Sequence, residues 1–152
     1  MHYRLATEAD IELLAGLRWV HEFEETETPF AISKDDFIRQ CTSFLKEGLA
    51  TRQWAYWIAE EKGDLIANIF IRRIQKVPKP QKLVAEIGYI TNVHTKIEYR
   101  NKGIGTELLK RVKQWATDNK IELLFLWPSE KSINYYKRQG FSAQNDILEL
   151  EF

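Results

Sequence analysis

The stretch YRNKGIGTELL, residues 99–109, constrains the fold more than any other part of the chain. The run before it, VAEIGYITNVHT, is rich in β-branched and aromatic residues, which is typical of a strand. Beyond it, Ile104, Leu108 and Val112 recur at helical spacing and predict an amphipathic helix. Gly103 and Gly105 stand at the junction, so the chain is expected to turn sharply there from a strand into a helix.

A strand, then Arg-x-x-Gly-x-Gly, then a helix is an arrangement suited to binding an anion. Glycines let the backbone approach a ligand closely, and the free amides and dipole of the first helical turn favour negative charge. Arg100 and Lys102 add cationic side chains beside those amides, and a pyrophosphate would fit. The alternative is that the two glycines only make a tight turn.

Two familiar nucleotide motifs do not match this stretch. The phosphate-binding loop of many ATPases needs Gly-Lys followed by Ser or Thr after a longer loop, which this chain lacks. The dinucleotide fingerprint needs a third glycine, where this chain has Leu108, and it sits near the first strand of a βαβ unit.

The rest of the chain indicates a sheet layered with helices. Capping signals at Thr7 and Ser33 precede two predicted helices, and the acidic stretch between them, residues 21–30, is predicted to be a loop. The other predicted strands begin at Tyr3 and cover residues 54–60, 65–74, 121–127 and 146–152, with a last helix after Pro128. Strands 54–60 and 65–74 have apolar residues on both faces, which predicts that helices cover both sides. We expect one α/β (α+β layered) domain spanning residues 1–152.

Composition excludes several classes of protein. Lys plus Arg and Asp plus Glu both number 22, so the chain is not the strongly basic protein that nucleic-acid or polybasic membrane binding favours. No apolar run approaches the about 20 residues that span a bilayer, and the N-terminus lacks a secretory pattern, so a cytoplasmic location is expected. The one cysteine, Cys41, lies on a predicted apolar helix face and is interpreted as a core residue.

Two motifs resemble the GCN5-related N-acetyltransferase (GNAT) family. EYRNKGIGTELLKRVKQWA resembles its acetyl-CoA motif, Arg/Gln-x-x-Gly-x-Gly/Ala, and LWPSEKSINYYKRQGF resembles its late helix ending in Tyr-x-x-x-Gly-Phe. One strand separates them, as in the family, and the element order matches over nearly the whole chain. The resemblance implies a mixed, mostly antiparallel sheet of six to seven strands flanked by about four helices.

The same resemblance implies acetyl-CoA as co-substrate, with no metal. The amides of residues 102–106 would wrap the pyrophosphate, Arg100 would flank it, and the preceding strand would offer backbone groups to the pantetheine arm. The residues expected to bind the co-substrate are Val93, Thr95, Arg100, Asn101, Lys102, Gly103, Ile104, Gly105, Thr106 and Ser132. Ser129 stands where many members have a cofactor-contacting asparagine.

Tyr136 aligns with the family's tyrosine, which protonates or hydrogen-bonds the leaving thiolate, and it is the expected general acid. Its neighbour Tyr135 matches an apolar position and is expected in the core. The general base is less defined, because the positions where many members carry glutamate hold Tyr89 and Thr91. Glu86, acting through water, and His94 are the two candidates.

The acceptor is expected to be an amine of a small molecule, a peptide or a protein, with Glu24 and Glu25 of the acidic stretch as candidates for binding it. The implied reaction is direct acetyl transfer without a covalent enzyme intermediate. A non-catalytic acyl-CoA-binding regulatory module of the same fold is the alternative, since the strand glutamate is missing. Five tryptophans and eight phenylalanines leave enough aromatic surface for a homodimer interface.

Overall fold

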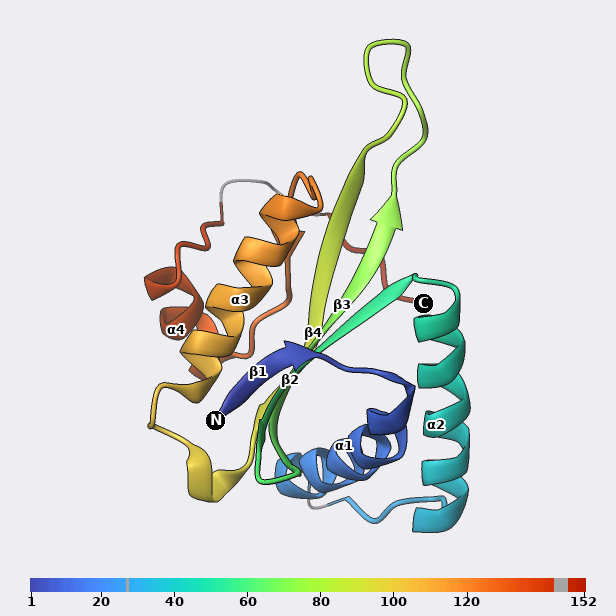
Figure 1. Ribbon diagram of the computed structural model, residues 1–152, viewed down its shortest axis with the longest axis vertical. Coiled ribbons are helices and arrows are strands. Elements are labelled where there is room, and N and C mark those ends of the chain that lie inside the picture. Colours follow the sequence, from blue (N-terminus) through green and yellow to red (C-terminus); the bar gives the residue numbers. More distant parts are fainter. Residues whose placement is uncertain (27, 144–147) are drawn as a thin grey trace.

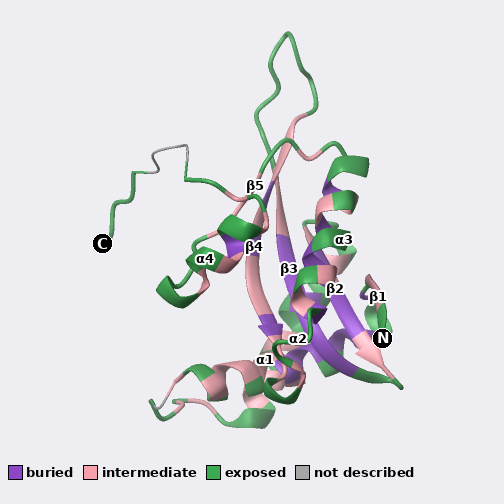
Figure 2. Cartoon of the chain, turned by 90° about the vertical axis from the view of Figure 1, so that its left-hand side faces the viewer, coloured by how far each residue is buried: buried purple, intermediate pink, exposed green. Residues whose placement is uncertain are grey.

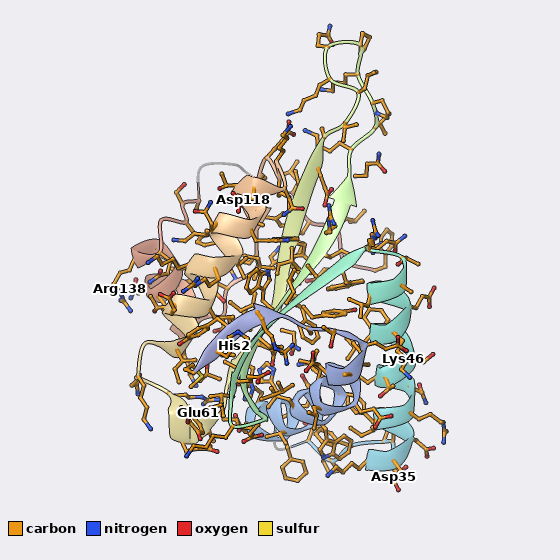
Figure 3. All side chains as sticks on the ribbon, in the orientation of Figure 1. His2, Asp35, Lys46, Glu61, Asp118 and Arg138 are labelled. Atoms are coloured by element: carbon orange, nitrogen blue, oxygen red, sulfur yellow. The ribbon has the colours of Figure 1, made fainter. Side chains whose placement is uncertain are left out.

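A five-stranded mixed sheet forms the centre of the computed structural model, which describes residues 1–26, 28–143 and 148–152 (Figure 1). The strands follow the order β1-β2-β3-β4-β5, and every neighbouring pair is antiparallel except β4 and β5, which are parallel. Their bounds are β1 His2–Leu5, β2 Trp54–Glu61, β3 Asp64–Gln75, β4 Glu86–Thr95 and β5 Leu124–Phe125. The hairpin between β3 and β4 projects beyond the rest of the molecule, with its side chains spread into solvent (Figure 3).

Helices cover both faces of this sheet, with α1 and α2 on one side and α3 and α4 on the other (Figure 1). The helices are α1 Ile11–Glu25, α2 Lys34–Ala50, α3 Ile104–Asp118 and α4 Ile133–Arg138, with 3₁₀ turns η1 Glu8–Asp10, η2 Ile97–Tyr99 and η3 Glu130–Ser132. The expected two-sided cover is confirmed.

Alternation along β2 explains why both faces of the sheet are apolar. Tyr56 and Ile58 are fully buried in a cluster with residues of α1 and α2. Ala55 and Ala59 point the other way, into a cluster with Leu108 and other residues of α3. Successive side chains of a strand face opposite sides, so a strand between two layers needs apolar residues at both parities. Figure 2 shows the resulting purple core along β2 and β3, with the outer surfaces of the helices exposed.

The strand count is smaller than expected, because the predicted strand at residues 146–152 is not formed where it is described. Residues 148–152 are irregular, with Leu148, Leu150 and Phe152 exposed, while the start of that prediction lies outside the described residues. The strand expected at residues 121–127 is reduced to two residues, which pair only with Gly88 and Tyr89. An apolar alternating segment becomes a strand only where a partner edge accepts its backbone hydrogen bonds.

The acidic stretch predicted as a loop is in large part helical, since α1 continues to Glu25. Carboxylates near a helix C-terminus are disfavoured by the helix dipole, so something must offset them. Glu22 forms an ion pair with Arg18 one turn earlier, with 2.5 Å between the charged atoms. Glu24 contacts two groups outside the helix, described below. These contacts outweigh the local preference for a loop.

Asp10 joins the start of α1 to strand β1. The Arg4 guanidinium donates to both carboxylate oxygens of Asp10, at 2.7 and 2.9 Å, and the Thr7 backbone N–H donates to Oδ2 at 2.7 Å. Asp10 is 6% exposed. The charge-assisted hydrogen bonds from Arg4 hold the pKa of the Asp10 carboxyl well below its usual range.

We expect Asp10→Ala to lower the free energy of unfolding by about 3 kcal/mol at pH 7, because it removes two charge-assisted hydrogen bonds from Arg4, which keeps only Glu60 as its carboxylate partner, and leaves the Thr7 N–H without its acceptor. A carboxyl whose pKa falls on folding stabilises the protein fully above its unfolded pKa, about 4, and loses that contribution as the pH falls through its folded pKa. Urea unfolding at pH 7 and at pH 3 checks both points: the difference between the variant and the wild type should shrink at pH 3. Equal stabilities at pH 7 would contradict the assignment.

Candidate functional site

A β-bulge near the end of β4 shapes one wall of the candidate site. The register of β3 and β4 shifts between Asn68 and Phe70, and Asn92 takes a left-handed conformation with φ 47°. The buried Asn68 side chain donates from Nδ2 to the Asn92 carbonyl at 2.5 Å. An extra residue in one strand bends it and redirects the side chains that follow. Val93 and His94 come directly after this bulge.

The glycine turn forms the next wall and begins α3. Gly103 precedes the helix with φ 78°, a left-handed conformation that favours glycine. Gly105 lies in the first turn, and a Cβ added there would meet only Thr95 Oγ1 at 3.6 Å and Tyr135 Oη at 3.7 Å. The N–H groups of this turn are the unpaired donors of a helix N-terminus. The backbone is therefore open to a ligand at the point where the helix dipole favours negative charge.

A cavity of about 440 Å³ lies between the β4 bulge, this turn and α4. It brings together most of the residues expected to bind the co-substrate. Those lining it are Val93, Thr95, Arg100, Asn101, Gly103, Ile104, Gly105, Thr106 and Ser132. The Lys102 side chain lies instead over the Tyr99 ring, with its ammonium nitrogen 5.2 Å from the ring centroid. His21 and Tyr99 also line the cavity and were not singled out from the sequence.

Tyr136 and Tyr135 both border this cavity from α4. The Tyr136 ring is 8% exposed and packs against Phe141 with 5.6 Å between ring centroids. Burial raises the pKa of Tyr136 to about 12, so the phenol keeps its proton at neutral pH. Tyr135, expected in the core, is only partly buried, and its hydroxyl lies at the glycine turn, 3.7 Å from the position that a Cβ on Gly105 would take. It packs against the core with its ring while its polar end reaches the glycine turn.

A pair of histidines connects α1 to the β4 bulge. His94 Nε2 lies 3.1 Å from Glu24 Oε2, and the His94 and His21 rings stack with centroids 4.5 Å apart. The His94 side chain is 1% exposed, and its Nδ1 atom is buried without a hydrogen-bond partner among the described residues. Burial lowers the pKa of His94, while the hydrogen bond to Glu24 opposes that change. The lowered pKa favours a neutral imidazole in the cavity wall, with one buried ring nitrogen that no described residue engages.

Arg100 is tied to both neighbouring walls. Its Nε donates to the Thr95 carbonyl at 2.8 Å, and its terminal nitrogen donates to Glu24 Oε2 at 2.5 Å. Glu24 therefore holds a cation of the glycine turn and the imidazole of His94 with the same oxygen. Glu25, one residue later on α1, is exposed and lines the cavity.

Glu86, the other candidate base, is not brought to this cavity. It is the first residue of β4, at the opposite end of the strand from Thr95, and pairs with Gln75 in the register. Its carboxylate accepts from Arg73 Nε at 2.5 Å and from a second Arg73 nitrogen at 3.0 Å. Glu86 is thus an ion-pair partner of Arg73 within the sheet. The sequence shows that Glu86 lies on the strand, but it does not show that Arg73 lies beside it.

Comparison with known proteins decides the family. A sequence model described as the acetyltransferase (GNAT) family matches residues 17–141, which include the bulge, the glycine turn and α4. The chain belongs to the GNAT family. The resemblance seen in the sequence, and the mixed sheet with four helices that it implied, are confirmed.

Solved structures of other GNAT-like proteins agree with this membership. The chain is similar to a predicted acetyltransferase from Clostridium acetobutylicum, solved with acetyl-CoA, with 32% identity, a TM-score of 0.81, and 99% of this chain and 95% of that chain covered. It is also similar to a GCN5-related N-acetyltransferase from Ralstonia eutropha, with 24% identity, a TM-score of 0.75, and 99% and 97% covered. No curated sequence is similar enough to count as a match.

GNAT enzymes use acetyl-CoA as co-substrate, and membership therefore supports acetyl transfer in general. The donor set fits such a ligand, because the cavity joins the first-turn amides of α3, Arg100 and the end of β4. Within residues 1–26, 28–143 and 148–152, no three His, Cys, Asp or Glu side chains are grouped as a metal ion would require. Within the same ranges, no helix is long and apolar enough to cross a membrane.

Proposed function

We propose that this GNAT protein transfers an acetyl group directly from acetyl-CoA to an amine nitrogen. The observation that carries the proposal is the meeting of the glycine turn, the N-terminus of α3, Tyr136 and His94 on one cavity. A turn that only reversed the chain would not require a buried phenol and a buried imidazole on the same surface. The amine acceptor belongs to a small molecule, a peptide or a protein.

The glycine turn holds the pyrophosphate in this proposal. Backbone amides of residues 102–106 donate to the phosphate oxygens, and Arg100 adds a charge-assisted hydrogen bond. Asn101 and Ser132 line the same cavity and extend the polar surface. Val93 and Thr95, at the end of β4 beyond the bulge, offer backbone groups to the pantetheine arm.

Starting from an ammonium acceptor, the reaction removes two protons from the nitrogen and delivers one to the leaving thiolate. The neutral amine nitrogen attacks the acetyl carbonyl carbon and forms the C–N bond, while negative charge collects on the carbonyl oxygen. A backbone amide at the bulge stabilises that oxygen. The C–S bond then breaks, and the thiolate takes the proton of the Tyr136 hydroxyl, which its raised pKa keeps in place until then. The nitrogen of the new C–N bond still carries one proton more than the amide product, and it returns that proton to the Tyr136 oxygen.

His94 accepts the proton of the acceptor ammonium, through a water molecule, in this mechanism. Three features support the role: the lowered pKa, the unpartnered Nδ1, and the Glu24 carboxylate that holds Nε2 as the donor. Glu25 is the exposed carboxylate at the cavity and is proposed to attract the cationic amine. Glu24 is engaged by Arg100 and His94, which makes it a supporting residue rather than a substrate ligand.

We expect His94→Gln to lower turnover about a hundredfold, the usual contribution of a positioned base, with little change in coenzyme A affinity. Glutamine keeps hydrogen-bonding capacity in the buried position but does not titrate. Steady-state thiol release and isothermal calorimetry measure the two quantities. His2→Gln on the exposed β1 strand is the control and should behave as wild type. An unchanged rate in His94→Gln would refute the base.

Thiol release from acetyl-CoA over a panel of small amines and peptides with free amino groups tests the proposed function itself. Amine-dependent release with matching acetylated product, identified by mass spectrometry, is the expected result. Coenzyme A binding without release on any acceptor would favour the regulatory module instead. No coenzyme A binding in calorimetry at high micromolar concentration would refute the site.

A further inference from the structure

Glu24 links two parts of the cavity that are far apart in the chain. It lies on α1, while its partners are His94 on β4 and Arg100 in the turn before α3. Both partners contact the same atom, Glu24 Oε2, at 3.1 Å from His94 Nε2 and 2.5 Å from the Arg100 nitrogen. A single carboxylate oxygen thus serves the proposed base and the proposed phosphate ligand together.

The two partners differ in how firmly they are placed. His94 is enclosed, with a side chain 1% exposed, and stacks on His21. The Arg100 side chain is 41% exposed and is anchored by Nε to the Thr95 carbonyl, so its terminal nitrogens sit at the cavity wall. Partly exposed ion pairs contribute little stability, whereas a phosphate anion forms strong charge-assisted hydrogen bonds with arginine. A ligand at the turn can therefore compete with Glu24 for Arg100.

We propose that Glu24 couples donor binding to the base: a phosphate group bound at the glycine turn draws the Arg100 charge away and leaves the Glu24 carboxylate to His94 alone. This inference rests on the proposed function and adds a sequence of events to it, in which the donor binds before the base is strengthened. Glu24 acts through His94 and Arg100 and is a positioning residue. The free protein keeps a weak base, and the base is strengthened once the donor is bound.

The direction of the effect follows from the charges that face His94. Glu24 and His21 approach it from α1, and Arg100 from the turn after β4, while Arg18 reaches the same network by donating to Asn92 Oδ1. Glu24 raises the pKa of His94, and Arg100 and His21 lower it. Once a bound phosphate engages the positive charge of Arg100, the negative charge of Glu24 is less neutralised. The pKa of His94 should therefore rise when a phosphate ligand binds.

Nitrogen-detected NMR of the histidine rings, titrated with pH with and without saturating coenzyme A, tests this coupling. The chain has three histidines, and the exposed His2 is an internal reference. In wild type, coenzyme A should raise the pKa of His94 by about one pH unit, the size expected of a charge change within a few ångströms. In Arg100→Gln, the pKa of His94 should already be raised without ligand, and coenzyme A should change it less than half as much.

Two further variants make the result specific. Lys102→Gln removes a cation from the same turn, where Lys102 lies over Tyr99, and should weaken coenzyme A binding but keep the full response of His94 at saturation. Glu24→Gln removes the shared carboxylate and should lower the pKa of His94 and abolish most of the response. It also serves as the second test if Arg100→Gln does not fold.

The outcomes separate the inference from the proposed function. Coenzyme A that binds while the pKa of His94 stays unchanged, or changes equally in Arg100→Gln and wild type, overturns the coupling and leaves acetyl transfer standing. No binding of coenzyme A to the wild type overturns the proposed function, and the coupling falls with it. A response present in wild type and Lys102→Gln but largely lost in Arg100→Gln supports the coupling.

Discussion

Gly105→Glu is expected to weaken coenzyme A binding by at least about a hundredfold, equivalent to about 2.7 kcal/mol, while the protein stays folded. Gly105 has an ordinary helical backbone, so a side chain is accommodated without the strain expected at Gly103, where φ is 78°. The added Cβ would lie between Thr95 and Tyr135, both of which line the cavity. The longer side chain then fills the cavity and brings a carboxylate against the phosphate position. Calorimetry with coenzyme A measures the loss.

Two controls separate cavity filling from damage to the fold. Gly105→Ala adds only the Cβ, whose contacts at 3.6 and 3.7 Å are ordinary, and should keep binding within about threefold of wild type. Gly16→Glu makes the same chemical change in α1, where an added Cβ meets nothing within 4 Å, and should bind as wild type does. If Gly105→Glu keeps its affinity, the turn does not hold the pyrophosphate.

The sequence predicted the elements around this turn because local signals define them. A left-handed glycine before a helix and a helical apolar stripe are local patterns, and both are found at Gly103 and along α3. Strands with apolar residues on both faces predicted the layered sheet, because this pattern is local as well. The strand predicted at residues 146–152 is not formed where those residues are described. Alternation of apolar residues defines the two faces of a strand, but it does not show which neighbouring strand would pair with it.

Most of the candidate site was predictable from two motifs and from the strand before the first of them, which supplies Val93, His94 and Thr95. Arg100, Gly103, Gly105 and Tyr136 lie in two motifs, and all four line one cavity. His21 and the contacts of Glu24 were missed, since these contacts join residues 70 or more positions apart. Glu86 was assigned from its strand alone, without the Arg73 that engages it. Glu24 reaches His94 because the acidic stretch around it is helical and not a loop. That helix depends on tertiary contacts, which the sequence does not show.

Tyr136→Phe is expected to reduce turnover by about a hundredfold or more, with coenzyme A affinity unchanged within about threefold, because it removes one proton donor. The ring remains in the core against Phe141, so packing and the cavity shape are preserved. Steady-state thiol release gives the rate, calorimetry gives the affinity, and thermal unfolding confirms the fold. The effect should appear in kcat, since the hydroxyl acts on the leaving thiolate and not on the bound ground state.

Tyr135→Phe is the matched control for this prediction. The two tyrosines are adjacent on α4 and both line the cavity, but the Tyr135 hydroxyl lies beside Gly105 at the glycine turn. Losing that hydroxyl should weaken coenzyme A binding slightly and leave kcat near the wild-type value. The reverse pattern, with kcat lost in Tyr135→Phe and kept in Tyr136→Phe, would move the acid to Tyr135, whose partly buried hydroxyl also reaches the cavity. Unchanged kcat in both variants would mean that the thiolate leaves without a proton from α4.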